Sequence, residues 1–119
     1  MEKRLNDAKT MVDAKQYNNA LELLIPLFEE RERDHELYFL LGKCFLETGD
    51  SSNAVRFFQK AIELNLREPE YLLALGRAYE SFGDPIKAMD TYLKVLALSP
   101  ESVVASERML ALVNGWDKP

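Results

Sequence analysis

The chain has 119 residues, of which 47% are hydrophobic, so it is long enough for one compact domain and no more. Its formal net charge of -5 at pH 7 disfavours a nucleic-acid partner, because binding to phosphates depends on an excess of lysine and arginine. A single cysteine, Cys44, excludes an intramolecular disulfide, so the chain needs no oxidising compartment.

The first residues turn polar at once and lack the apolar core of a signal peptide. No segment approaches the length and apolarity of a membrane span. We therefore expect no membrane association and a cytoplasmic location, provided that the chain was not cut from a longer one.

A period of 34 residues divides the chain into three units, at about 1–34, 35–68 and 69–102. Small residues recur where two backbones must approach, and large residues recur where a gap must be filled, which predicts one helical hairpin stacked three times. The recurring sets are Ala8, Gly42 and Gly76; Met11, Phe45 and Tyr79; Ala20, Ala54 and Ala88; and Leu24, Phe58 and Tyr92.

The first unit keeps the period but has a weaker pattern, because Arg4 and Asp7 occupy positions that are apolar in the later units. An end unit with no predecessor tolerates such residues. Pro26 lies inside its second helix, where the later units have Lys60 and Lys94. An interior proline costs about 3 kcal/mol, so we expect a kink there, as a tolerated surface bend rather than a hinge.

In the second unit, apolar residues recur at three and four positions over 37–46, which predicts a helix with one buried stripe. Gly49 and Asp50 end this helix. A second helix is predicted over 54–64, with the serines at 51–52 as candidate caps.

The third unit repeats this design, with a helix over 72–79 and a turn at Gly83. Pro85 suits the first position of the next helix, with Asp84 as its N-cap. After this unit, an apolar periodic run at about 103–115 predicts a seventh helix. We expect it to cover the last hairpin, since an uncovered repeat would leave its apolar face in water.

These motifs resemble the tetratricopeptide repeat over residues 1 to about 102. The second unit reads Tyr38-x2-Leu41-Gly42-x2-Phe45 and then Ala54-x3-Phe58-x2-Ala61, and the third reads Leu72-x2-Leu75-Gly76-x2-Tyr79, then Ala88-x3-Tyr92 and Pro100. The departures are Ala8 for glycine, Leu24 for an aromatic residue and Leu66 for the terminal proline. The resemblance implies an all-α, right-handed superhelical stack of three helix-turn-helix hairpins with a C-terminal capping helix.

No residue pattern predicts catalysis, a cofactor or a metal site. His35 is the only histidine, and neither His35 nor Cys44 has a catalytic partner at a recognisable spacing. The strings GxGxxG and GxxxxGK[ST] are absent, which removes the usual nucleotide-binding fingerprints. We therefore expect a protein that is not an enzyme.

In the family that the chain resembles, the first helix of each unit lines a concave groove for a partner peptide. Three rows repeat on these helices at i, i+3 and i+7, and so follow one stripe of each helix. The rows are Glu2, Glu36 and Glu70; Leu5, Phe39 and Leu73; and Lys9, Lys43 and Arg77. Such a groove would suit a segment with apolar anchors beside acidic groups.

Each row also has a structural interpretation. Lys9 with Asp13 and Lys43 with Glu47 are possible i,i+4 pairs that keep an exposed face polar, and the apolar row is also consistent with ordinary packing between repeats. A known subclass of the family clamps the C-terminal carboxylate of chaperones, but this chain has Leu5, Leu40, Glu70 and Ala74 at the corresponding places, with only Lys9 basic. We expect no clamp of that kind.

The sequence thus predicts an adaptor or scaffold that binds a protein or peptide, as a monomer or weak homodimer. The alternative is a structural unit that self-associates through its end faces or belongs to a larger repeat array. The sequence leaves open whether the concave or the convex face binds.

Overall fold

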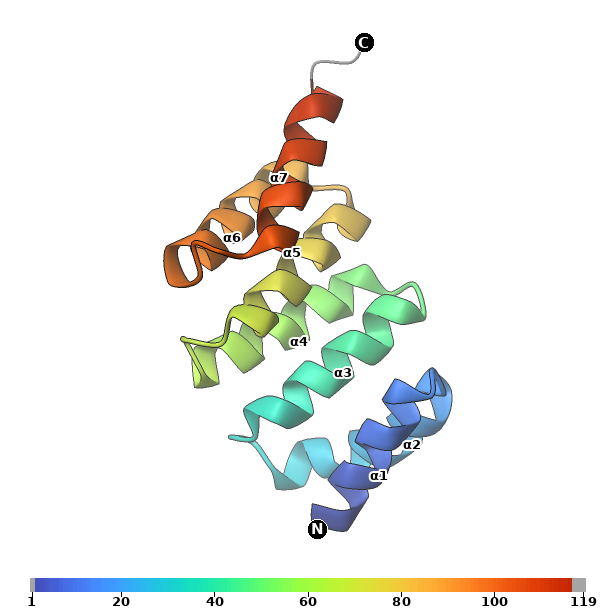
Figure 1. The fold of residues 1–119 in the computed structure, drawn as a ribbon. Coiled ribbons are helices and arrows are strands. Elements are labelled where there is room, and N and C mark those ends of the chain that lie inside the picture. The colour runs from blue at the N-terminus through green and yellow to red at the C-terminus, as the bar shows by residue number, and fades with distance from the viewer. Residues whose placement is uncertain (1, 117–119) are drawn as a thin grey trace.

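The computed structural model describes residues 2–116, with side chains from Lys3 to Gly115, and within this range all regular structure is helical (Figure 1). The helices are α1 (Glu2–Asp13), α2 (Tyr17–Glu30), α3 (His35–Glu47), α4 (Ser51–Leu64), α5 (Pro69–Phe82), α6 (Pro85–Leu98) and α7 (Val103–Trp116). None of these helices is long and apolar enough to cross a membrane.

Consecutive helices form three hairpins, α1 with α2, α3 with α4 and α5 with α6. The second helix of each hairpin also packs against the first helix of the next, and α7 packs against α6 in the same way. The stack measures 47 × 28 × 22 Å, with α1 and α7 at opposite ends (Figure 1). The predicted all-α solenoid of three hairpins with a seventh, capping helix is confirmed.

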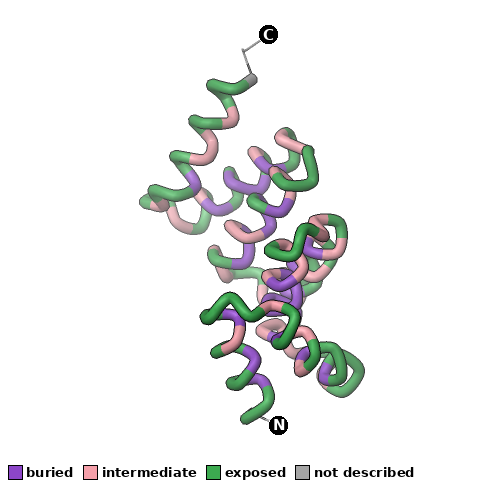
Figure 2. The backbone as a smooth tube through the Cα atoms, turned by 90° about the vertical axis from the view of Figure 1, so that its right-hand side faces the viewer, coloured by how far each residue is buried: buried purple, intermediate pink, exposed green. Residues whose placement is uncertain are grey.

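The core is divided into three clusters of buried side chains, one at each junction of the stack. The first cluster joins α1, α2 and α3, the second joins α3, α4 and α5, and the third joins α5, α6 and α7. Figure 2 shows the buried positions where helices face one another. Each unit therefore depends on its neighbours for burial, as expected of stacked repeats.

Glycine recurs every 34 residues where the two helices of a hairpin approach most closely. A Cβ atom on Gly42 would lie 2.5 Å from the ring of Phe58, and one on Gly76 would lie 2.5 Å from the ring of Tyr92. The first unit has Ala8 and Leu24 at these positions, and both are fully buried. The two departures from the family pattern match each other, because the narrower leucine leaves room for the alanine methyl.

The first helix of every hairpin ends in the same turn. Gly49 and Gly83 adopt left-handed backbone angles, with φ of 92° and 89°, and the first unit has Lys15 at this position with φ of 62°. The next residue in each unit donates its backbone N–H to a carbonyl five residues back, at 2.8 to 2.9 Å. This is the Schellman arrangement, which favours glycine because a side chain is strained there.

Aspartates cap the second helices of the second and third hairpins. Asp84 accepts a hydrogen bond from the backbone N–H of Lys87, as the sequence predicts, with Pro85 at the first helical position. Before α4, however, the N-cap is Asp50, whose carboxylate accepts from the N–H of Asn53. The serine cap predicted there was wrong, because the aspartate one residue earlier provides the acceptor and the serines lie inside the helix.

The two ends of the stack differ from its middle. The helix α2 continues through Pro26 to Glu30, and the proline is exposed; the predicted kink stays a prediction. Between Val103 and Gly115, α7 has one fully buried residue, Ala105, and Met109 and Leu112 pack against the third cluster. The outer side of α7 leaves Val103, Leu110 and Val113 between 47% and 64% exposed.

Candidate peptide-binding face

The two sides of the stack are built from different helices. The first helices contact one another in succession, α1 with α3 and α3 with α5. No comparable contact joins α2 to α4 or α4 to α6 in the described part of the chain. The side formed by α1, α3, α5 and α7 is therefore the tighter, inner face of the curved stack, and the side formed by α2, α4 and α6 is the outer face.

The predicted apolar row lies on the inner side of the stack, but most of it is used for packing. Leu5 is 5% exposed in the first cluster and Phe39 is 8% exposed in the second. The Phe39 ring stacks on the ring of Tyr71, with 4.6 Å between centroids. Only Leu73 is half-buried and retains surface for a ligand. Packing between repeats therefore accounts for two of these three residues.

Two cations of the basic row make contacts, one across a junction between units and one within its own helix. The ammonium of Lys9 lies 3.2 Å from the carboxylate of Glu36, and the ammonium of Lys43 lies 5.4 Å from the centroid of the Phe39 ring. Neither of the predicted i,i+4 pairs occurs among the ion pairs of residues 3–115. Lys43 and Arg77 have no carboxylate partner in that set, so both cations remain available.

Of the acidic row, Glu36 is half-buried and paired with Lys9, whereas Glu70 is exposed. The side chain of Glu2 lies outside the described range. The acidic edge is thus partly neutralised at the first junction, and the two free cations lie on α3 and α5. The inner face of the second and third units thus carries both signs of charge, with Lys43 and Arg77 near Glu47, Glu70 and Glu80.

A hollow of about 480 Å³ opens on this face where α3, α5 and α7 meet. It contains the guanidinium of Arg77, which forms no ion pair among the described residues. The other side chains that line the hollow, from α3, α5 and α7, are both apolar and polar. The lining residues are Leu46, Glu47, Arg77, Glu80, Ser81, Val104 and Arg108.

A half-buried carboxylate at one wall of this hollow joins α5 to α7. Glu80 accepts hydrogen bonds from the Arg108 guanidinium, one of them at 3.0 Å, and from the Tyr92 hydroxyl at 2.5 Å. Burial alone would raise the pKa of Glu80, but these hydrogen bonds and the charges of Arg108 and Arg77 outweigh it, so the pKa is lowered from its ordinary value of 4.5.

The Glu80–Arg108 pair was not predicted, although the sequence contains a signal for it. Glu80 lies one period after Leu46, and Arg108 lies one period after Ala74. Two positions that are apolar in the preceding unit thus carry opposite charges in the third unit and in α7. A paired departure of this kind from a repeat pattern indicates a contact between the two positions.

The residues considered for chemistry make structural contacts. His35 Nδ1 lies 2.7 Å from the Tyr71 hydroxyl. Cys44 is completely buried, and burial raises the pKa of its thiol to about 11, which the charge of Lys43 offsets only slightly. Among residues 2–116, no group of three or more His, Cys, Asp or Glu side chains is placed to hold a metal ion.

The profile of the tetratricopeptide repeat matches residues 35–67 and 69–102, and the chain belongs to this family. This fold generally serves protein interaction. Among curated proteins, the chain is 36% identical over 75 residues to the uncharacterized protein ycf37 of Pyropia yezoensis, which covers 60% of this chain and 40% of that protein. The chain thus spans less than half the length of this relative.

Two solved structures illustrate the likeness in fold. The crystal structure of MamA superposes with a TM-score of 0.93 at 27% identity, over 97% of this chain and 67% of that chain. The Yersinia enterocolitica chaperone SycD, in complex with a peptide of the translocator YopD, superposes with a TM-score of 0.88 at 15% identity, over 98% of this chain and 94% of that chain.

Proposed function

We propose that the chain is a non-enzymatic adaptor that binds an acidic peptide, or an acidic segment of a protein, along its inner face. The observation that carries this proposal is the pair of unpaired cations, Lys43 and Arg77, one period apart on adjacent helices. Both lie on first helices of the stack, on the side that also contains the hollow and the half-buried Leu73. The likeness to SycD supports it, because a protein of this fold binds a peptide in that complex.

The stack would act by preorganisation. Its helices are packed before any partner arrives, so a bound segment would lose its own freedom without ordering the receptor. Carboxylates on the segment would pair with the two cations, and an apolar side chain would contact Leu73 or enter the hollow. The full set of proposed contact residues is Leu5, Lys9, Glu36, Phe39, Lys43, Glu70, Leu73 and Arg77, of which Leu5 and Phe39 contribute through packing.

A random peptide library displayed on phage tests this proposal without a known partner. Peptides selected on the chain should be rich in Asp and Glu. They should bind a Lys43→Glu, Arg77→Glu double variant at least about tenfold more weakly, because attraction becomes repulsion. The matched control is Arg33→Glu with Arg67→Glu, which reverses two exposed charges one period apart in the loops between units.

Equal losses in both double variants would indicate general electrostatic attraction instead of a site. No loss in either, with the fold intact by circular dichroism, would contradict binding on the inner face.

One observation favours the alternative, a unit that associates through its end. The outer side of α7 exposes Val103, Leu110 and Val113, and such a surface can be covered by another chain. Light scattering over a range of concentrations separates the two functions. A dimer that Leu110→Ser dissociates would favour association, and a monomer at every concentration favours the adaptor.

A further inference from the structure

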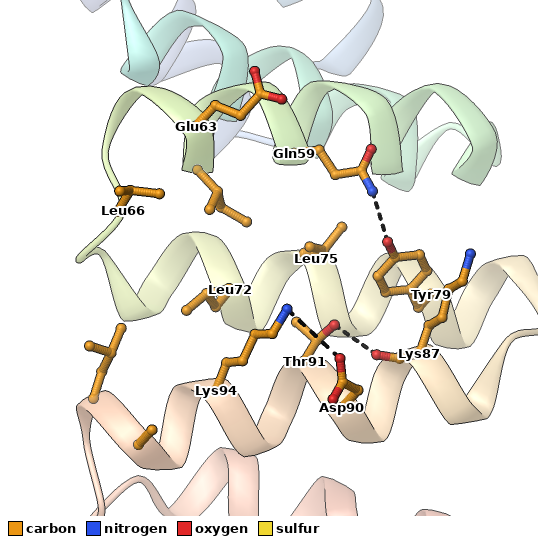
Figure 3. A pocket seen from close by; sticks show the side chains of 13 residues that line it. Gln59, Glu63, Leu66, Leu72, Leu75, Tyr79, Lys87, Asp90, Thr91 and Lys94 are labelled. Atoms are coloured by element: carbon orange, nitrogen blue, oxygen red, sulfur yellow. Dashed lines mark hydrogen bonds and ion pairs between the residues drawn. The ribbon is translucent and has the colours of Figure 1, made fainter.

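A large cleft lies on the outer face, away from the site proposed above. It has a volume of about 830 Å³ and opens between α4 and α6, with α5 as its floor (Figure 3). Apolar side chains make most of its wall, and Leu66 at its mouth is 71% exposed. Its lining includes Ile62, Leu66, Leu72, Tyr79, Lys87 and Thr91.

The chain contains a second copy of this cleft, one unit earlier, and fills that copy with its own aromatic rings. Between α2 and α4, the ring of Phe57 stacks on Phe45 at 5.4 Å between centroids and meets Phe28 edge-on at 5.8 Å. Tyr38 stacks on the same ring at 6.3 Å. The hollow that remains there is about 320 Å³.

One period later, three of these four rings are replaced by smaller side chains. Ile62 corresponds to Phe28, Leu72 to Tyr38, Thr91 to Phe57 and Tyr79 to Phe45. All four of the later residues line the large cleft. The central ring of the cluster is therefore missing, and the other members of the cluster remain around the vacated space.

The walls of the cleft are held in place by hydrogen bonds. The Thr91 hydroxyl donates to the backbone carbonyl of Lys87 at 2.7 Å, and Thr91 is only 4% exposed at the bottom of the cleft. The Gln59 amide donates to the Tyr79 hydroxyl at 2.8 Å, which positions the one remaining ring as a side wall (Figure 3). The polar groups at the walls thus have partners, and an apolar ligand leaves them satisfied.

One charge at the cleft is uncompensated. Glu63 pairs with Lys60 at 3.7 Å, and Asp90 pairs with Lys94 at 3.8 Å. The ammonium of Lys87 lies 5.9 Å from the centroid of the Tyr79 ring and has no carboxylate partner among the ion pairs of the described residues. A ligand with an acidic group beside an aromatic ring would complement this arrangement.

We propose that the cleft between α4 and α6 binds an aromatic side chain of a partner polypeptide that has an adjacent acidic residue. The ring lies over Thr91 and against Tyr79, where the ring of Phe57 lies in the preceding unit. The acidic group pairs with Lys87. This outer site is separate from the inner face, so the chain can contact a partner on both sides.

The probe is a short peptide, acetyl-Gly-(para-fluoro-Phe)-Glu-Gly-amide, followed by fluorine NMR as the chain is added. We expect a saturable shift with an affinity of about millimolar, as one buried ring and one exposed ion pair allow. On the side of the chain, the Ile62 methyl should shift in the ring current, whereas those of Ile25 and Ile86, which lie outside the cleft, should not.

Thr91→Phe restores the missing ring from within the chain. It should lower the affinity for the probe at least about tenfold, since the ligand and the new side chain compete for one space. Its matched control, Thr91→Val, removes the hydroxyl but keeps the size, and should bind as the wild type does. Ile62→Phe blocks the cleft from the α4 side and serves if Thr91→Phe does not fold. The wild-type chain should bind this probe more tightly than the same peptide with Gln in place of Glu. Lys87→Gln should abolish that difference in affinity.

Three results would each overturn the proposal: no saturable shift with the wild-type chain, undiminished binding to a folded blocked variant, or loss of binding when the inner face is changed. The Lys43→Glu, Arg77→Glu variant should still bind the probe. If it does not, the probe occupies the inner face and the outer site is wrong, whereas the function proposed for the inner face stands.

Discussion

The left-handed residue of the first unit offers a test of how backbone conformation limits stability. Lys15 adopts φ of 62° in a turn that the later units make with Gly49 and Gly83. The left-handed conformation costs a residue with a Cβ about 1–2 kcal/mol. Replacement by glycine removes this cost. It also increases the conformational freedom of the unfolded chain, which lowers the free energy of unfolding by about 0.4–1 kcal/mol. We therefore expect Lys15→Gly to raise the free energy of unfolding by about 0.5–1 kcal/mol.

The side chain of Lys15 is exposed and forms none of the ion pairs of the described residues, so its loss removes no contact. The assay is urea unfolding followed by circular dichroism, with the slope checked for change. Lys15→Ala is the matched control, because alanine removes the long side chain but keeps the Cβ. It should leave stability nearly unchanged.

The reverse changes complete the test. Nothing lies within 4 Å of a Cβ built on Gly49 or Gly83. Gly49→Ala and Gly83→Ala should therefore destabilise the chain through the backbone alone, by about 1 kcal/mol. The reasoning would be refuted if Lys15→Gly were no more stable than Lys15→Ala.

Two further predictions concern the third unit. Gly76→Ala places a methyl against the ring of Tyr92, whose hydroxyl donates a hydrogen bond to Glu80. Overpacking should lower the free energy of unfolding in urea by about 1–3 kcal/mol. An unchanged midpoint would contradict the close approach. Because the pKa of Glu80 is lowered, its contribution to stability is present above pH 4.5 and is lost as the pH falls through the lower pKa of the folded state. Glu80→Gln should flatten the dependence of the urea midpoint on pH below 4.5, and an equally steep dependence in both proteins would contradict the role given to the Arg108 contact.

Much of the fold could be predicted because it depends on residues close together in sequence. The spacing of apolar residues defines each helix, and Gly83, Asp84 and Pro85 mark one turn by their own conformational preferences. The cap of α4 could not be resolved from composition, because Asp50 and Ser51 are both good caps and the choice depends on where the helix begins.

The candidate site was less predictable. A row of residues on one helix stripe can face either a ligand or the next repeat, and the spacing is the same in both cases. Phe39 and Leu5 are buried because the first helices lie against one another. The spacing of residues within one helix does not contain that contact. Lys9 pairs with Glu36 across a junction for the same reason.

By itself, the sequence determined the period of 34, the helical hairpin as the repeated unit and the glycines at the close approaches, since each follows from conformational preference and side-chain size at fixed spacing. Only the tertiary structure decided which repeated residues are buried, which cations remain free and where space is left between helices. The outer cleft shows the reason. Thr91 is an ordinary helix residue in sequence, and its small size creates a cleft only because α4 and α6 both pack on α5 and leave a gap between them.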